Sequence, residues 1–154
     1  MQRTMRRSDR ALSEQETRSI LNNGGFGVLS VIDDDGLPYG IPLHYAMIDN
    51  RICFHSTSGA SHKAEGLRPG SPVAFAVLEM ENAVEGRSAI AFGTARPCPE
   101  LKRQTLESLV EKFVPEPGWN TAKEGIPHAL NSFEAYCIEI ERITGKRIEK
   151  PEGR

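Results

Sequence analysis

The segment His55–Leu67, HSTSGASHKAEGL, combines two histidines, a lysine and several hydroxyl side chains in a short space. It follows the strand-like run RICFHS. Gly59 permits a tight turn, and Ser61 is suited to cap a helix that begins near His62. The first turn of a helix presents free N–H groups and a partial positive charge, to which Lys63 adds a full charge. Such a strand-to-helix junction offers the donors that a phosphate monoester requires. The hydroxyl donors would be Ser56, Thr57, Ser58 and Ser61.

Two other interpretations of this segment stay open on composition alone. A capped, solvated turn accounts for the same residues as well as a phosphate site does. A metal site would require His44, His55 and His62 to converge from adjacent strands. The sequence has no His-x-x-x-His pair and no Cys/His ligand spacing, so we expect no dedicated metal centre. A serine nucleophile is disfavoured as well, because Gly-x-Ser-x-Gly is absent.

Length and composition suit one globular domain. The chain has 154 residues, of which 38% are hydrophobic and 26% charged, and its formal net charge is -2. This charge provides no broad attraction to nucleic acid or to an anionic membrane. The three cysteines, Cys53, Cys98 and Cys137, form no Cys-x-x-Cys pair. No apolar run reaches membrane-spanning length and no apolar signal segment follows the basic start, so we expect a cytoplasmic protein.

The first half of the chain predicts one helix and three strands joined by short turns. The helix covers 12–23, where Ser13 and Glu16 form a capping box. Strands follow at 25–32, 37–48 and 52–56. Alternation along the second strand predicts one face with Ile41, Leu43, Tyr45 and Met47, and another with Pro42, His44 and Ala46. Because proline cannot donate a ladder hydrogen bond, Pro42 indicates an edge, a bulge or an opening in the sheet.

The second half predicts three more strands, at 71–79, 87–97 and 133–143. A helix at about 100–114 carries an apolar stripe, and the proline- and glycine-rich segment 115–131, which holds the single tryptophan, is expected to be a loop. The polar segment TGKRIEKPEGR closes the chain. We therefore expect a mainly β protein with peripheral helices, a small antiparallel barrel of six strands. Its domain would span 1–146, with a polar tail at 147–154.

The order of three motifs resembles a known family. The first motif is the long stretch GVLSVIDDDGLPYGIPLHYAMIDNRICFHSTSGASHKAEGLRPGSPVAFAV. The second is FGTAR, and the third is IEIERITGK. From about Met5 to Lys146 this order is similar to the FMN-binding split-barrel family related to pyridoxamine 5′-phosphate oxidase, and most similar to its nim-type (nitroimidazole reductase-like) branch. The resemblance implies a homodimer of six-stranded split β-barrels with FMN at the dimer interface.

The resemblance also implies roles for individual residues. YGIPLHY would run beside the isoalloxazine ring and FHSTS would line the pocket, while SHK would hold the phosphate. The ring would lie near Ile41, Pro42, Leu43 and His44, with Tyr45 toward the ribityl phosphate. Pocket residues would be His55, Ser56, Thr57 and Ser58, and phosphate ligands Ser61, His62 and Lys63. His55 is the candidate catalytic residue, as a proton donor or substrate contact near the reactive face of the flavin.

Departures from the oxidase pattern narrow the expected activity. Gly40 and Tyr45 stand where the oxidase has an arginine and a lysine, His62 replaces an arginine, and the C-terminal Arg-Leu-x-Arg motif is missing. We therefore expect a flavin-dependent oxidoreductase of small acceptors such as nitroaromatics, reduced by NADH or NADPH, rather than an oxidase of pyridoxamine phosphate. The alternatives are a non-catalytic FMN store or sensor, or the same barrel holding haem or a deazaflavin.

Overall fold

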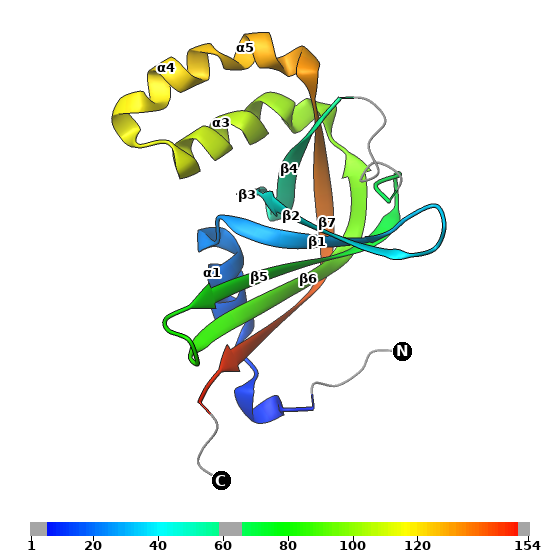
Figure 1. Ribbon diagram of the computed structural model, residues 1–154, viewed down its shortest axis with the longest axis vertical. Coiled ribbons are helices and arrows are strands. Elements are labelled where there is room, and N and C mark those ends of the chain that lie inside the picture. Colours follow the sequence, from blue (N-terminus) through cyan, green and yellow to red (C-terminus); the bar gives the residue numbers. More distant parts are fainter. Residues whose placement is uncertain (1–5, 59–65, 151–154) are drawn as a thin grey trace.

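Alternating apolar residues assemble one curled antiparallel sheet in the computed structural model, which describes residues 6–58 and 66–150 (Figure 1). Its strands are β1 Phe26–Ile32, β2 Pro38–His44, β3 Ala46–Ile48, β4 Arg51–Thr57, β5 Ser71–Met80, β6 Gly86–Pro97 and β7 Phe133–Ile148. Their order in the sheet is β2-β1-β5-β6-β7-β4-β3. The expected mainly β split-barrel architecture is confirmed, although the sheet has seven strands instead of six.

The additional strand arises at Tyr45, where the expected strand 37–48 divides into β2 and β3. β2 pairs with β1, whereas β3 pairs with β4 at the far end of the sheet. The predicted grouping on one face is confirmed, because Tyr45 belongs to the main hydrophobic core and Ile41, Leu43 and Met47 pack against it. Ala46, predicted on the other face, is buried in a second, smaller core. Pro42 lies in an edge strand, where a missing N–H is tolerated.

Helices cover the two ends of the sheet (Figure 1). The 3-10 turn η1 Ser8–Arg10 precedes α1 Glu14–Asn23, which begins with the predicted capping box. At the other end lie η2 Pro99–Leu101, α3 Lys102–Phe113, η3 Glu116–Gly118, α4 Trp119–Glu124, α5 Ile126–Ala129 and η4 Leu130–Ser132. Among the residues that the structure describes, no helix combines the length and apolar character that crossing a membrane requires.

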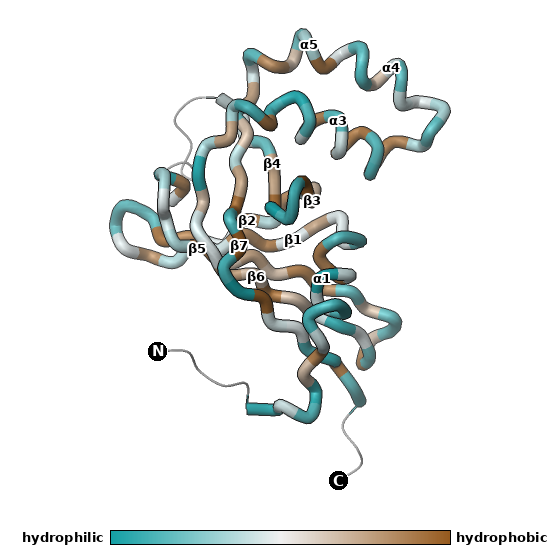
Figure 2. Tube along the Cα trace, turned by 180° about the vertical axis from the view of Figure 1, so that it is seen from behind, coloured by the Kyte–Doolittle hydropathy of each residue, from teal (hydrophilic) through white to brown (hydrophobic). Residues whose placement is uncertain are grey.

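The segment 115–131 is helical, so the prediction of a loop was wrong. Pro117 and Pro127 occupy first-turn positions, where proline lacks only an N–H that would have no helical partner. The helices fold back on α3 to form what we call the helical arm, residues 102–132 (Figures 1 and 2). Trp119 packs within this arm, since its Nε1 donates a hydrogen bond to the Val114 carbonyl at 2.7 Å.

β7 is longer than the expected strand 133–143, because it continues through 144–148 alongside β6. The polar residues after 143 were expected to be a tail, but their backbone pairs with β6, and an isolated bridge joins Lys146 to Ala11 on the other side. The register between β6 and β7 shifts between Phe92 and Gly93. A side chain at Gly93 would collide with the Glu139 carbonyl, so glycine permits this close approach.

Tyr45 connects several of these elements. Its side chain is fully buried, its hydroxyl donates to the Leu21 carbonyl near the end of α1 at 2.6 Å, and its ring lies 4.9 Å from that of Phe75. The Lys112 ammonium of α3 donates to the Tyr45 carbonyl at 3.1 Å and lies 4.3 Å from the ring centroid. Burial raises the pKa of Tyr45 and lowers that of Lys112.

Replacing Tyr45 by phenylalanine should lower the free energy of unfolding by about 1–3 kcal/mol, because the buried Leu21 carbonyl loses its donor. Chemical denaturation in urea measures this change. The matched control is Tyr136→Phe, since Tyr136 keeps its ring stacked on Phe54 and its hydroxyl has no hydrogen-bond partner within 6–58 and 66–150. Equal losses in the two variants would contradict a special role for the Tyr45 hydroxyl.

Candidate functional site

The predicted ring-binding residues of β2 lie on both of its faces. Ile41 and Leu43 are half-buried and pack on the main core, whereas Pro42 and His44 are exposed on the outer face. β2 is an edge strand, so within the described residues no other strand covers its second side. Backbone groups on that side are therefore available to a ligand.

Tyr45 does not join this group, which corrects the expectation that it faces a ribityl phosphate. Its side chain has no exposed surface, and its hydroxyl is bound to the Leu21 carbonyl. The strand break turns Tyr45 into the core while leaving His44 outside. Alternation could not reveal this, because it identifies a face and not whether solvent reaches it.

The end of β4 carries the next four predicted residues. His55 is half-buried, and its ring lies 4.9 Å from that of Phe133 at an angle of 84°. Ser56 is buried, whereas Thr57 and Ser58 are exposed. The Ser58 N–H donates to the Ser132 carbonyl at 2.9 Å, which ties the end of β4 to the helical arm. The predicted phosphate ligands Ser61, His62 and Lys63 lie outside the described residues.

His44 and His55 line one apolar cavity of about 300 Å³ between the sheet and the helical arm, which we call the arm pocket. The lining consists of His44, His55, Leu106, Leu109, Val110, Phe113, Val114, Ala122, Gly125, Ile126 and Ala129. The sequence predicted the first helix of the arm, at about 100–114, but missed the remainder because the prolines of 115–131 were interpreted as loop residues. A signal was present, since Ala122, Ile126 and Ala129 recur at i, i+4 and i+7.

Two phenylalanines hold the His44 ring at the edge of the arm pocket. The rings of Phe26 and Phe113 each lie 4.4 Å from it, centroid to centroid. Phe26 is 61% exposed and Phe113 39%, so the cluster remains open to solvent on one side. Aromatic contacts of this kind restrict the orientation of the imidazole.

Neither metal chemistry nor thiol chemistry is supported by the described residues. In residues 6–58 and 66–150 no three histidine, cysteine or acidic side chains are placed to hold a metal ion. Cys53, Cys98 and Cys137 are buried, with the sulfurs of Cys53 and Cys137 3.1 Å apart. Burial raises the pKa of Cys98 to about 12, and the contact with Cys53 raises that of Cys137. Thiols held protonated in this way are poor nucleophiles.

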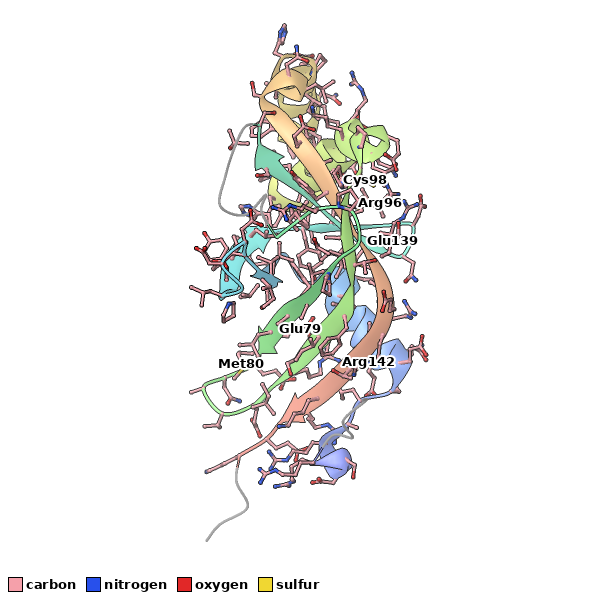
Figure 3. All side chains as sticks on the ribbon, turned by 90° about the vertical axis from the view of Figure 1, so that its right-hand side faces the viewer. Glu79, Met80, Arg96, Cys98, Glu139 and Arg142 are labelled. Atoms are coloured by element: carbon pink, nitrogen blue, oxygen red, sulfur yellow. The ribbon has the colours of Figure 1, made fainter. Side chains whose placement is uncertain are left out.

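Ionic contacts surround Cys98 where β6 leaves the sheet (Figure 3). The Arg96 guanidinium donates to Glu139 at 3.3 Å and to Glu100 at 2.9 Å, while the Cys98 thiol donates to Glu100 at 3.3 Å. The donors and acceptors of this group therefore form hydrogen bonds with one another. We interpret this group as structural, linking β6, β7 and the start of the helical arm.

A strip of apolar side chains faces outward from the sheet on β1 and β5. We define this outer strip as Phe26, Val28, Ile32, Leu78 and Met80, which are between 40% and 61% exposed. Val28 pairs with Pro42 of β2 on one side and with Ala76 of β5 on the other. Val28 therefore has small or apolar neighbours on both adjacent strands, whereas the exposed Ser30 separates it from Ile32 along β1.

Comparison with known proteins places these features in context. The sequence model of the family described as pyridoxamine 5′-phosphate oxidase matches residues 13–147. No curated protein matched the chain.

Several solved structures share the fold. A conserved hypothetical protein of Mycobacterium tuberculosis superposes with a TM-score of 0.74 at 24% identity, over 95% of this chain and 90% of that one. A candidate 5-nitroimidazole antibiotic resistance protein of Bacteroides thetaiotaomicron superposes with a TM-score of 0.68 at 17% identity, over 89% of this chain and 86% of that one. An FAD- and haem-binding protein of Mycobacterium smegmatis superposes with a TM-score of 0.68 at 22% identity, over 92% of this chain and 75% of that one.

Proposed function

Because the chain belongs to the pyridoxamine 5′-phosphate oxidase family, we propose that it is a cytoplasmic flavoprotein that binds FMN and reduces small acceptors. The observation that carries the proposal is the edge strand β2. It exposes Pro42 and His44 on its outer face and leaves one side without a partner strand among the described residues. The arm pocket, with its two histidines, opens beside it.

The described residues suit a flavin ring, which is planar and apolar with a polar rim. The half-buried Ile41 and Leu43 supply apolar contacts, and the uncovered side of β2 supplies backbone groups for the rim. Thr57 and Ser58 add exposed hydroxyls at the end of β4. Ser61, His62 and Lys63 are proposed as the phosphate ligands on the sequence resemblance alone. A lysine and a histidine suit a single phosphate monoester, so we propose FMN as the flavin.

Bound flavin supplies two-electron chemistry, in which NAD(P)H, a proton and an acceptor A give NAD(P)⁺ and AH₂. The protein supplies placement and hydrogen bonds. His55 is proposed to contact the acceptor through an imidazole nitrogen and to donate a proton there. The edge contact with Phe133 holds its ring, which reduces the ordering needed when a substrate binds.

The outer strip supports a homodimer as part of the same proposal. Several exposed apolar side chains on one face are costly to leave in water and mark a contact site in many proteins. A second copy is the proposed partner. Two such copies would cover Phe26 and Val28 and place β2 near the interface, where the resemblance expects the flavin.

Haem is an alternative on the chemistry of two residues. Histidine is a common haem ligand, and His44 and His55 line the same apolar cavity, but about 300 Å³ is small for a macrocycle of four pyrrole rings. A deazaflavin and a purely storage or sensor role are further alternatives. The absorption spectrum of the purified protein distinguishes haem, flavin and deazaflavin.

The reductase proposal predicts a yellow protein whose flavin absorbance bleaches with NADH or NADPH under anaerobic conditions and returns when a nitroimidazole is added. Stopped-flow absorbance measures both steps, and mass spectrometry identifies the released ligand. A flavin that no nicotinamide reduces would instead support a store or sensor. A Soret band would contradict the flavin proposal in favour of haem.

The proposed phosphate ligands predict a selective loss of affinity. Replacing His62 and Lys63 together by alanine should weaken FMN binding by about 100-fold or more, because charge-assisted contacts to the phosphate are lost. Fluorescence titration measures the affinity. Riboflavin, which lacks the phosphate, is the control ligand, and its affinity should change little. Equal losses for both ligands would contradict the assignment.

The dimer proposal predicts that a charge in the outer strip weakens self-association. Val28→Lys should raise the dimer dissociation constant at least about tenfold, because a lysine would be buried without a partner. Sedimentation velocity measures this change. The control is Val84→Lys, since Val84 is 44% exposed in the turn between β5 and β6, compared with 40% for Val28. A stable monomer that binds FMN tightly would contradict an interface site.

A further inference from the structure

We propose that the arm pocket is a binding site for a small, uncharged, planar ring compound, and that this ligand is the acceptor. The identification as acceptor rests on the proposed function, whereas the binding site itself rests on the geometry of the pocket. The cavity lies between the sheet and the helical arm, whose second part, 115–131, the sequence had predicted as a loop.

Size and lining determine the class of ligand. A cavity of about 300 Å³ is at the small end of ligand sites, so it suits one or two rings. Of the lining residues within 6–58 and 66–150, none is aspartate, glutamate, lysine or arginine. Among these described residues an anion would lose its hydration without gaining an ion pair, which favours an uncharged ligand over a phosphorylated or carboxylated one. The nearby Lys112 ammonium is bound to the Tyr45 carbonyl instead of lining the pocket.

Two imidazoles supply the polar contacts that would orient such a ring. His44 is held between Phe26 and Phe113, and His55 is held against Phe133. Each imidazole can donate or accept a hydrogen bond at the rim of a ligand. Apolar walls with few fixed polar groups are typical of sites for small aromatic molecules.

His44 connects this pocket to the proposed flavin site. It is the last residue of β2, the strand proposed to run beside the flavin, and it also lines the arm pocket. A ring in the pocket would therefore border the flavin through His44. This position identifies the ligand as the acceptor rather than as a structural lipid or an unrelated effector.

Isothermal titration calorimetry of the purified protein, with whatever cofactor it retains, tests the site using two non-reducible probes. 4-Methylphenol should bind at least tenfold more tightly than 4-hydroxybenzoate, which differs by a carboxylate in place of the methyl group. Ala129→Phe should fill the cavity and weaken 4-methylphenol binding at least tenfold. His128→Phe is the control, because His128 is exposed on the same short helix and does not line the pocket.

A second variant keeps the test decisive if Ala129→Phe fails to fold. Val110→Ala enlarges the pocket and should increase the affinity for 2-naphthol relative to 4-methylphenol at least threefold. Equal affinity for the neutral and anionic probes, or binding that neither pocket variant alters, would overturn the site. Probe binding in a protein that lacks flavin would support the site and refute the proposed function. A flavin-loaded protein without probe binding would support the proposed function and refute the site.

Discussion

The burial of Tyr45 is the interaction on which the arrangement of this molecule depends. Its hydroxyl, ring and carbonyl contact α1, β5 and α3 respectively, so three elements meet at one residue between β2 and β3. Apolar packing encloses the ring, and each polar atom named here has a partner. Buried polar groups stabilise a fold only when they are satisfied in this way. The strand break is therefore a junction, and α3 is held against the sheet through Lys112.

This junction explains why the candidate site has two parts. Because the chain turns inward at Tyr45, His44 remains outside, next to Phe113 of α3. β4 brings His55 to the same cavity, and the helical arm closes it. One part is an open strand edge suited to a flat cofactor, and the other is an apolar pocket suited to a small partner molecule. The two histidines are not adjacent in sequence, but the folded sheet brings both of them to one cavity.

Local signals in the sequence predicted the parts of this structure that depend on neighbouring residues. Ser13 and Glu16 identified the start of α1, and alternation grouped Ile41, Leu43 and Met47 on one face, which packs against the core. Signals failed where distant contacts decide the outcome. The role of Tyr45 depends on Leu21 and Lys112, which alternation does not reveal. Pro127 suggested a loop although it lies in the first turn of α5, and residues 144–148 extend β7 because β6 lies beside them.

The course of β7 has a consequence for how the chain reaches its folded state. Near Tyr136–Ile138 it pairs with β6 on one side and with β4 on the other, so it joins the two halves of the sheet. β4 ends at Thr57, and its partner Phe133 is synthesised much later. Such non-local pairing slows folding, because a long loop must close before the contact forms. During synthesis the edge of β4 that pairs with β7 would therefore stay unpaired until β7 emerges. We expect the emerging chain to need protection from aggregation at this strand.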